Sequence, residues 1–338
     1  MKRYRVALAG YYGFGNFGDE LLAEAAIAAL LRCGVDRERI VLLSAAPEES
    51  KQKFGVDSVN RWKMSHVLKT LSQSETLLLG GGGLFQDSSS LLSCFYYWGL
   101  VRAARFCGAV PWALGQSVGP LSTRMGRRLT RDALSKCSVV QVRDAASEAL
   151  CASLGLSVET GDDLALSLAD FFAKPTDNDK PPTPGKKLLV NLRPTAGGFA
   201  ERLAAAIPPD TALIGVALSD EDERLMNRLA KLDKNGVLPL TRIERIATMS
   251  DALRVFGELD GAAAVGMRLH FVVLAAMAGV PVVAAPYDPK VEGFSIKYDI
   301  PMWRGGELPQ PRPASFSDDF SVQRVRDGID GLCRRVLE

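Results

Sequence analysis

Histidine is scarce in this 338-residue chain, which contains only two, His66 and His270. The six cysteines are scattered, and no two of them have C-x-x-C spacing. This pattern excludes a disulfide framework and a zinc-finger site, and it indicates reduced thiols of a cytosolic protein. No cluster of histidine, cysteine and carboxylate residues is present in the sequence, so we expect no metal site.

An excess of charge and a long apolar run are also missing. The net charge is +2, from 41 basic and 39 acidic residues, which gives no reason to expect nucleic-acid binding. The longest apolar run, residues 271–286, is too short to span a membrane and is interrupted by Gly279 and Pro281. No secretory signal is predicted. We expect a cytoplasmic protein, a location that allows contact with the inner face of the membrane.

The sequence does contain a regular alternation of short apolar runs with amphipathic segments. Helices are predicted between the apolar runs, for example over residues 19–33 and 145–154, each followed by a glycine. This alternation is typical of parallel β-sheets covered on both faces. The predicted strands are residues 6–9, 40–44, 76–79, 110–114 and 139–142, and then 188–192, 212–217, 261–265 and 280–285.

The alternation is interrupted once, and this interruption divides the chain. Residues 174–187 hold four prolines, four lysines and little that is apolar, which favours a linker. We therefore predict an α/β protein of two doubly wound, Rossmann-like domains, residues 1–173 and 188–338. The second domain is predicted to end in an amphipathic helix over residues 322–337.

Gly13, Gly15 and Gly18 spell G-x-G-x-x-G between a predicted strand and a predicted helix. A dinucleotide site also needs an acid at the end of the second strand, and none stands there. A tight turn with Asp19 capping the helix fits the segment, and so does a ligand loop with Asn16 and Asp19 facing a binding site.

Two further glycine segments follow predicted strands. Gly80 to Gly83 are four glycines in a row, more than a turn requires, and they allow a backbone to approach a ligand closely. The segment that contains Gly115 and Gln116 has the same character. We predict that Gly81, Gly82 and Gln116 lie in ligand loops.

The segment Gly266-Met267-Arg268-Leu269-His270 follows a small apolar run and opens a predicted helix. Unpaired N–H groups at a helix N-terminus attract anions, and the arginine and histidine would add a fixed cation and a proton donor. The segment therefore predicts a site where a phosphorylated substrate is bound and protonated.

Arg143 and Lys290 also follow predicted strands, although each alone fits a structural cap or an exposed loop. Because the carboxyl ends of parallel strands share one edge, the candidate segments should meet there, in a cleft between two facing domains. Converging cations would suit a small, multiply charged anion.

In the order and spacing of these motifs the chain resembles the polysaccharide pyruvyl transferase family, and its CsaB-like members in particular. The resemblance covers nearly the whole chain. It departs at Asp163, where a proline is expected after the aspartate of Gly161-Asp162. The motifs that carry it are Gly15 to Glu20, Gly80 to Gly83, Gly115 to Pro120, Val142 to Asp144, Gly161 to Asp163, Met267 to His270 and Tyr287 to Lys290.

The resemblance implies a GT-B-like fold and the transfer of pyruvate from phosphoenolpyruvate (PEP) to a sugar as a ketal. In CsaB-like members the acceptor is typically a lipid-pyrophosphate-linked disaccharide with terminal N-acetylmannosamine, modified at O4 and O6, and the product anchors surface-layer proteins. PEP is then a donor substrate, and no cofactor is expected.

The resemblance and the residue chemistry together suggest roles for the candidates. We predict PEP binding by Arg143, Arg268, Leu269 and Lys290, because arginine forks bind carboxylate and phosphate bidentately. His270 is the predicted acid and base, and Asp19 is a second candidate for activating the acceptor hydroxyl. Two rival functions are a nucleotide-sugar glycosyltransferase on the same fold and a non-catalytic sugar- or nucleotide-binding module.

Overall fold

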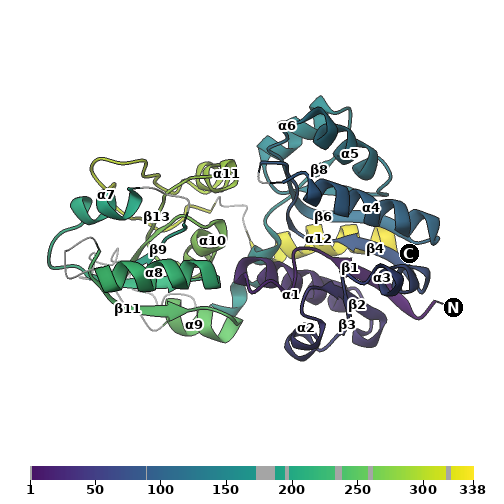
Figure 1. Cartoon of the computed structure of the whole chain (residues 1–338), viewed down its shortest axis with the longest axis horizontal. Coiled ribbons are helices and arrows are strands. Elements are labelled where there is room, and N and C mark those ends of the chain that lie inside the picture. The colour runs from purple at the N-terminus through teal and green to yellow at the C-terminus, as the bar shows by residue number, and fades with distance from the viewer. Residues whose placement is uncertain are drawn as a thin grey trace. The chain divides into compact units, whose positions relative to one another are not determined.

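The computed structural model describes residues 2–88, 90–172, 187–194, 198–232, 238–257, 262–316 and 321–338. The chain forms two compact units (Figure 1). Unit 1 contains Met1–Phe14, Asp19–Leu168 and Ser321–Glu338. Unit 2 contains Gly15–Gly18 and Ala169–Phe320.

Unit 1 is built on an eight-stranded parallel sheet. Seven strands follow the order β3-β2-β1-β4-β6-β7-β8, and β5 pairs with β6. The strands are β1 (Tyr4–Ala9), β2 (Ile40–Ser44), β3 (Asp57–Asn60), β4 (Ser74–Leu79), β5 (Gly82–Phe85), β6 (Val110–Val118), β7 (Val140–Val142) and β8 (Glu159–Thr160).

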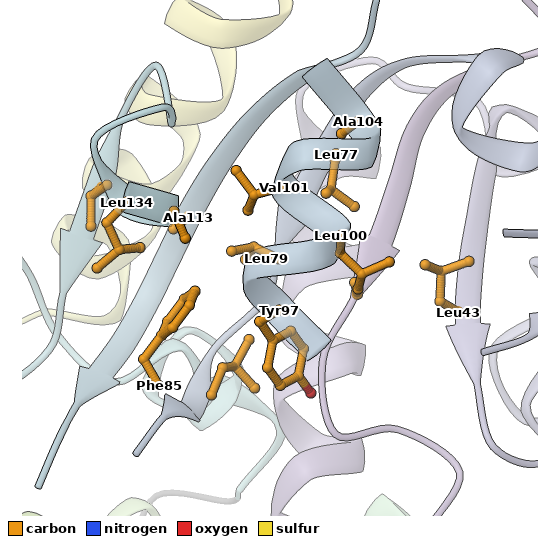
Figure 2. Packing of buried hydrophobic residues seen from close by; sticks show 14 of the residues in the cluster. Leu43, Leu77, Leu79, Phe85, Tyr97, Leu100, Val101, Ala104, Ala113 and Leu134 are labelled. Atoms are coloured by element: carbon orange, nitrogen blue, oxygen red, sulfur yellow. The ribbon is translucent and has the colours of Figure 1, made fainter. Parts of the chain in front are cut away.

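The helices of unit 1 cover this sheet. They are α1 (Phe17–Arg32, whose first residues belong to unit 2), α2 (Pro47–Phe54), α3 (Met64–Ser72), α4 (Leu92–Phe106), α5 (Arg124–Leu134), α6 (Ala145–Ser153) and α12 (Val322–Leu337), with 3-10 turns η1 (Arg37–Arg39) and η2 (Leu164–Phe171). Alternate strand residues such as Leu77 and Leu79 point to the side where Tyr97, Val101 and other residues of α4 pack (Figure 2). One hydrophobic core thus lies between the sheet and helices α3, α4 and α5.

Unit 2 has a five-stranded parallel sheet in the order β11-β10-β9-β12-β13. Its strands are β9 (Lys187–Asn191), β10 (Ala212–Ala217), β11 (Leu240–Arg245), β12 (Ala263–Gly266) and β13 (Val282–Ala284). Its helices are α7 (Phe199–Ala206), α8 (Asp220–Leu232), α9 (Met249–Gly257), α10 (Leu269–Met277) and α11 (Pro289–Lys297).

In both sheets the strand order reverses beside the first strand. The chain moves outward from β1 through β2 to β3 and then returns to place β4 on the other side of β1; β9 and β12 have the same relation in unit 2. Ligands of doubly wound sheets bind outside the carboxyl ends of the strands at such a switch point. The fold therefore predicts ligand binding at the carboxyl ends of β1 and β4 in unit 1, and of β9 and β12 in unit 2.

The predicted α/β class and the doubly wound pattern are confirmed. The predicted division of the chain needs two corrections. Gly15–Gly18 belongs to unit 2, and the C-terminal helix α12 belongs to unit 1. A terminal helix shows an apolar stripe in sequence but does not show which sheet it covers. The predicted linker lies outside the described residues except for Lys187, which begins β9.

Contacts along its whole length explain the placement of α12. Asp330 receives two hydrogen bonds from the Arg32 guanidinium, at 3.0 and 2.8 Å. Arg326 Nε donates to the Ser167 carbonyl at 2.8 Å, and Arg335 pairs with Glu159 at 2.8 Å. Val325, Ile329, Leu332 and Cys333 are buried, so the apolar stripe of the helix is covered within unit 1.

Candidate functional site

Four basic side chains follow three adjacent strands at the carboxyl edge of the unit 2 sheet. Arg193 lies two residues beyond β9, Arg268 and His270 follow β12, and Lys290 follows β13. Three of these four were predicted from sequence, and Arg193 was missed. The same rule that selected Arg143, an arginine just after an apolar strand, would have selected Arg193.

Arg268 is held in one orientation by a buried carboxylate. Its Nε and one terminal nitrogen each donate to Asp222, at 2.6 Å, and the same terminal nitrogen donates to Ser219 Oγ at 2.8 Å. Asp222 is fully buried, and the Arg268 side chain is 12% exposed. The Arg268 backbone N–H donates to Asn191 Oδ1 at 3.0 Å, so the start of α10 is fixed as well. A fork held this way is preorganised, and its charge is partly balanced by Asp222.

The sequence placed both Arg268 and His270 in the first turn of a helix, and the structure refines this. Arg268 is the N-cap residue, with extended backbone, and α10 begins at Leu269. Leu269 is buried, so only its backbone is positioned to meet a ligand. His270 is half-buried in the first turn.

Gly18 and His270, both selected from sequence, pack against each other within unit 2. A Cβ atom added to Gly18 would lie 2.2 Å from His270 Nδ1 and 2.8 Å from Cγ. Real Cβ atoms do not approach other atoms this closely, so only glycine leaves room for the imidazole ring here. Packing against His270, the predicted acid and base, therefore explains why a glycine stands at position 18.

The segment that contains Gly18 is anchored at the carboxyl ends of β10 and β11. The Phe17 N–H donates to the Leu218 carbonyl at 2.8 Å, and Arg245 donates to the Gly15 carbonyl at 2.9 Å. Gly15 has a φ of +70°, a conformation that favours glycine. Arg245 was missed because β11, with charged residues along it, does not look like a strand in sequence.

Asn16 provides the helix cap, whereas the sequence suggested Asp19. The Gly18 N–H donates to Asn16 Oδ1 at 3.3 Å, and Asp19 lies within the first turn of α1. The capping interpretation of Asp19 is therefore wrong. Its carboxylate lies beside the start of β5, 3.5 Å from where a Gly82 Cβ would stand.

Lys290 and Tyr287 lie in the loop and first helical turn after β13. Asp288 caps α11 by accepting from the Lys290 N–H at 3.0 Å, and Lys290 Nζ lies 3.9 Å from the Asp288 carboxylate. Arg193 donates to Tyr287 Oη and lies 4.7 Å from its ring centroid. Burial raises the pKa of Tyr287, while nearby Arg193 and Arg268 oppose the rise. The hydrogen bond and the ring contact place Tyr287 beside Arg193 at this edge.

At the switch point of unit 1 the glycines make room for a buried phenol. The Tyr12 side chain is fully buried. A Cβ atom added to Gly10 would lie 2.3 Å from its ring, and one added to Gly80 would lie 2.1 Å from its hydroxyl oxygen. Burial raises the pKa of Tyr12 well above its usual value, and its hydroxyl has no hydrogen-bond partner among the described residues. Tight packing therefore explains Gly80 without a ligand.

The other predicted ligand-loop residues of unit 1 are also buried. A Cβ atom added to Gly81 would lie 3.1 Å from Leu164 and 3.2 Å from Leu22. Gly82 begins β5 with a φ of +114°, so the four glycines are not one continuous loop. Gln116 is fully buried, and its Nε2 donates to the Gly80 carbonyl at 2.6 Å. Within the part of the chain that the structure describes, its Oε1 has no hydrogen-bond partner.

Arg143 lies in a buried ion pair in unit 1. Its terminal nitrogen is 2.5 Å from Asp163, and its Nε donates to Ser117 Oγ at 2.7 Å. Ser117 in turn donates to Asp144, which caps α6. The side chains of Arg143 and Asp163 are 5% and 2% exposed. Asp163 is the residue where the resemblance expected proline, so this departure supplies the arginine's partner.

Aromatic rings that sequence reasoning did not group together surround Arg61 near the ends of β1 and β3. The Arg61 guanidinium lies 4.3 Å from the Tyr96 ring centroid, 5.2 Å from Phe14 and 5.3 Å from Trp62. Tyr11 stacks on Phe14 at 4.0 Å, and Tyr11 and Trp62 are 46% and 61% exposed. We refer to Tyr11, Phe14, Trp62 and Tyr96 as the ring group. Exposed rings held over a buried cation are typical of a recognition surface.

Among the described residues, no group of three or more histidine, cysteine or carboxylate side chains is arranged to hold a metal ion. Within the same part of the chain, no helix has the length and apolarity needed to cross a membrane.

The two sheets define a two-domain Rossmann-like protein of the GT-B type, and solved structures support this fold. Anabaena HepE, solved with UDP-glucose, is 14% identical, with a TM-score of 0.57 over 99% of this chain and 94% of that one. A putative UDP-N-acetylglucosamine 2-epimerase from Listeria monocytogenes is 12% identical, with a TM-score of 0.57 over 100% of this chain and 91% of that one. A Rickettsia africae glycosyltransferase is also 12% identical, with a TM-score of 0.55 over 99% and 93%.

The family follows from sequence. The family model "Polysaccharide pyruvyl transferase" matches residues 16–289, and the chain belongs to this family. The resemblance drawn from the motifs is thereby confirmed, and the protein is an enzyme, a pyruvyltransferase. No curated protein matches the chain in sequence.

Proposed function

We propose that the protein transfers the pyruvyl group of PEP to a saccharide as a ketal, with PEP bound at the carboxyl edge of the unit 2 sheet. One observation carries this proposal: Arg193, Arg268 and His270 follow β9 and β12, the two strands that flank the switch point. A carboxylate and a phosphate need cations and helix N-termini, and both are present at this edge.

The chemistry assigned to this edge is a protonation followed by two additions. His270 donates a proton to the methylene carbon of PEP, and C2 becomes electrophilic. One acceptor hydroxyl adds to C2, phosphate leaves with its bridging oxygen, and a second hydroxyl closes the ketal ring. The two hydroxyl protons leave on His270 and on phosphate, so the reaction consumes PEP and a diol and releases inorganic phosphate.

The remaining candidates receive separate roles. Arg268 and Lys290 bind the anionic groups of PEP, together with Arg193 and the backbone of Leu269. We assign Asp19 to activating the acceptor hydroxyl by accepting a hydrogen bond from it, while the proton itself leaves on His270 or phosphate. Arg143 is buried against Asp163, so we propose that it holds the ends of β6 and β7 in place and does not contact PEP.

The acceptor we propose is a lipid-linked disaccharide that contains N-acetylmannosamine, with surface-layer anchoring as the use of the product. The ring group supports a saccharide acceptor, since exposed aromatic faces suit the apolar face of a sugar ring. The reaction then takes place in the cytoplasm, at the inner face of the membrane.

Phosphate release tests the donor. The enzyme is incubated with a saccharide acceptor and either PEP or UDP-glucose, and inorganic phosphate and UDP are measured. The proposal predicts phosphate from PEP that depends on the acceptor, and no UDP. Acceptor-dependent UDP release without use of PEP would instead support a nucleotide-sugar glycosyltransferase.

A further inference from the structure

Helices α3, α4 and α5 carry a surface that the chemistry above does not use. They lie in a row over one face of the unit 1 sheet (Figure 1). Their inward side supplies core residues such as Val67, Tyr97 and Leu134, of which Tyr97 and Leu134 are labelled in Figure 2. Their outward side is the docking face considered below.

Large apolar side chains are exposed along the docking face. Phe106 is 90% exposed and Leu92 is 76% exposed, and both lie on α4, four helical turns apart. Smaller exposures of 40–50% occur at Met64, Leu68, Phe95 and Met125. Single exposed apolar residues are ordinary, but a series across three neighbouring helices marks an interaction surface.

Contacts between the helices make the docking face continuous. The Cys107 thiol, next to Phe106, lies 3.8 Å from the Leu68 carbonyl of α3. On the other side of α4, Trp98 Nε1 donates to Asp132 of α5 at 2.7 Å. The exposed residues of α3 and α4 therefore belong to one surface, and α5 extends it.

The charge of the docking face has one sign. The three helices contain a single acidic residue, Asp132, whose carboxylate accepts hydrogen bonds from Trp98 and Lys136. The whole chain has a net charge of only +2, so the basic excess is local. The basic residues of these helices are Lys69, Arg102, Arg105, Arg124, Arg127, Arg128 and Arg131.

We propose that the docking face binds the surface of an anionic lipid bilayer. Apolar side chains set among lysines and arginines, with almost no carboxylate, match the interface of a membrane with acidic headgroups. A purely apolar partner would not explain the basic excess, and a soluble anion would not explain the exposed Phe106 and Leu92. The proposal goes beyond the pyruvyl transfer chemistry and does not depend on the identity of the donor.

The docking face also adjoins the ring group. Tyr96 of the ring group follows Phe95 of the docking face on α4, and Trp62 comes just before α3. Unit 1 bound to a bilayer through these helices would hold the ring group close to lipid headgroups. A saccharide attached to a lipid would then be presented beside the exposed rings.

Vesicle sedimentation of the full chain tests the proposal. We expect binding to vesicles of phosphatidylcholine with phosphatidylglycerol, weak binding to phosphatidylcholine alone, and loss of binding in about 0.5 M salt, where charges are screened. A basic side chain near such a surface changes binding about fivefold. The triple variant Arg105→Gln, Arg124→Gln, Arg128→Gln should therefore bind about 100-fold more weakly.

The apolar contribution is tested separately with Leu92→Ser, Phe95→Ser, Phe106→Ser, which should also release the protein from anionic vesicles. The matched charge control is Arg304→Gln, Arg312→Gln, Arg335→Gln, and the apolar control is Ile296→Ser, all at exposed positions off the docking face. Both controls should bind like the unchanged protein. Circular dichroism confirms that each variant is folded.

Three results would overturn the proposal: equal binding to both kinds of vesicle, controls that lose binding as strongly as the docking-face variants, or a stable dimer that the serine variant separates. Activity on a short, water-soluble acceptor should be unchanged in the docking-face variants. A protein that binds vesicles but has no PEP-dependent activity would contradict the proposed function and leave the docking face supported.

Discussion

Gly18 and His270 connect a sequence motif to a chemical role at the scale of single residues. In sequence, Gly18 completes a dinucleotide-like fingerprint, and His270 belongs to a separate motif more than two hundred residues later. In the structure they pack directly against each other in unit 2. A glycine is needed at this position to leave room for the imidazole ring. Its presence therefore does not imply a bound dinucleotide.

His270 is the residue on which the proposed protonation depends. Positioned acids and bases typically contribute about 10²- to 10⁴-fold in rate. We expect His270→Ala and His270→Gln to lower kcat by this factor in a PEP-dependent assay, because glutamine donates a hydrogen bond but does not transfer its proton. His66→Ala, an exposed change on α3, is the control. A folded His270→Gln enzyme with ordinary kcat would show that another group moves the proton.

Gly18→Ala should reduce activity through His270 alone. The new Cβ would stand 2.2 Å from Nδ1, so the ring must move. We expect a lower kcat in the single variant and no further loss when Gly18→Ala is added to His270→Ala, as residues acting through one contact are not additive. The control is Gly328→Ala, a helical glycine with open space around it. Additive losses in the double variant would contradict the contact.

Arg268 and Arg143 were both assigned to PEP binding from the sequence, but their substitution should have different effects. Arg268→Lys keeps the charge but loses the fork held by Asp222, and charged hydrogen bonds contribute about 1.5–3 kcal/mol. We expect the KM for PEP to rise about 10- to 100-fold by that measure. An unchanged KM in a folded Arg268→Lys enzyme would remove this residue from the donor site.

Arg143→Ala should chiefly lower stability, because it leaves Asp163 charged and buried. Breaking such a pair costs about 3–5 kcal/mol. In urea unfolding, Arg143→Met with Asp163→Leu should recover much of that loss, since an apolar pair of similar size needs no partner. If Arg143→Ala unfolds like the unchanged protein, the buried ion pair does not have the structural role we assign to it.

At the scale of elements, one carboxylate joins the loop after β5 to the loop that precedes α5. Asp87 accepts from the backbone N–H and hydroxyl groups of Ser122 and Thr123, at 2.6–2.9 Å. Burial alone would raise its pKa, but these hydrogen bonds outweigh burial and lower the pKa from 3.8 to about 2. Because the pKa of Asp87 is lower in the folded than in the unfolded state, its ionised form stabilises the folded protein at pH values above the unfolded-state pKa. This stabilisation is lost as the pH falls through the folded-state pKa.

We therefore expect Asp87→Asn to lower the free energy of unfolding at neutral pH, by an amount that shrinks as the pH falls from 3.8 towards 2. Urea unfolding of both proteins across this range measures the difference. Glu49→Gln, at an exposed position of α2, serves as the control. A difference that stays constant down to pH 2 would mean that the charge of Asp87 does not stabilise the loop.

The elements that sequence reasoning found and missed differ in burial. The central strands β1, β2, β9 and β10 are nearly continuous apolar runs, and the alternation with helices located them well. The missed strands β3, β8 and β11 are short or partly exposed, so their sequences carry polar residues. The buried strand β5 was missed for another reason, since its two glycines were taken as part of a loop. Arg61 and Arg245 follow or end missed strands, which is why neither was proposed.

At the scale of the whole molecule, the sequence predicted the two sheets and their parallel type, and it placed Arg268, His270 and Lys290 after strands of one sheet. It did not predict which sheet α12 covers, or that Gly15–Gly18 belongs to unit 2, because both depend on contacts between distant segments. It also did not show that Arg143 is neutralised, since its partner Asp163 was seen only as a departure from the family pattern.

The effect of ligands on the thermal stability of the whole protein should identify the donor substrate. We expect PEP to raise the melting temperature, because a ligand that binds only the folded state stabilises it. NAD should not, since no acid follows β2 at the position a ribose requires. A thermal-shift titration that shows stabilisation by NAD and none by PEP would contradict the donor assignment.

Ketal formation on the acceptor tests the central claim most directly. A lipid-linked disaccharide with terminal N-acetylmannosamine is incubated with the enzyme and isotopically labelled PEP, and the product is analysed by mass spectrometry. The account predicts a labelled product heavier by one pyruvate less one water, with an equal amount of phosphate, and formation of both slowed about 10²- to 10⁴-fold with His270→Gln. A product that gains a hexose from a sugar nucleotide, or a saccharide left unchanged while PEP is consumed, would contradict it.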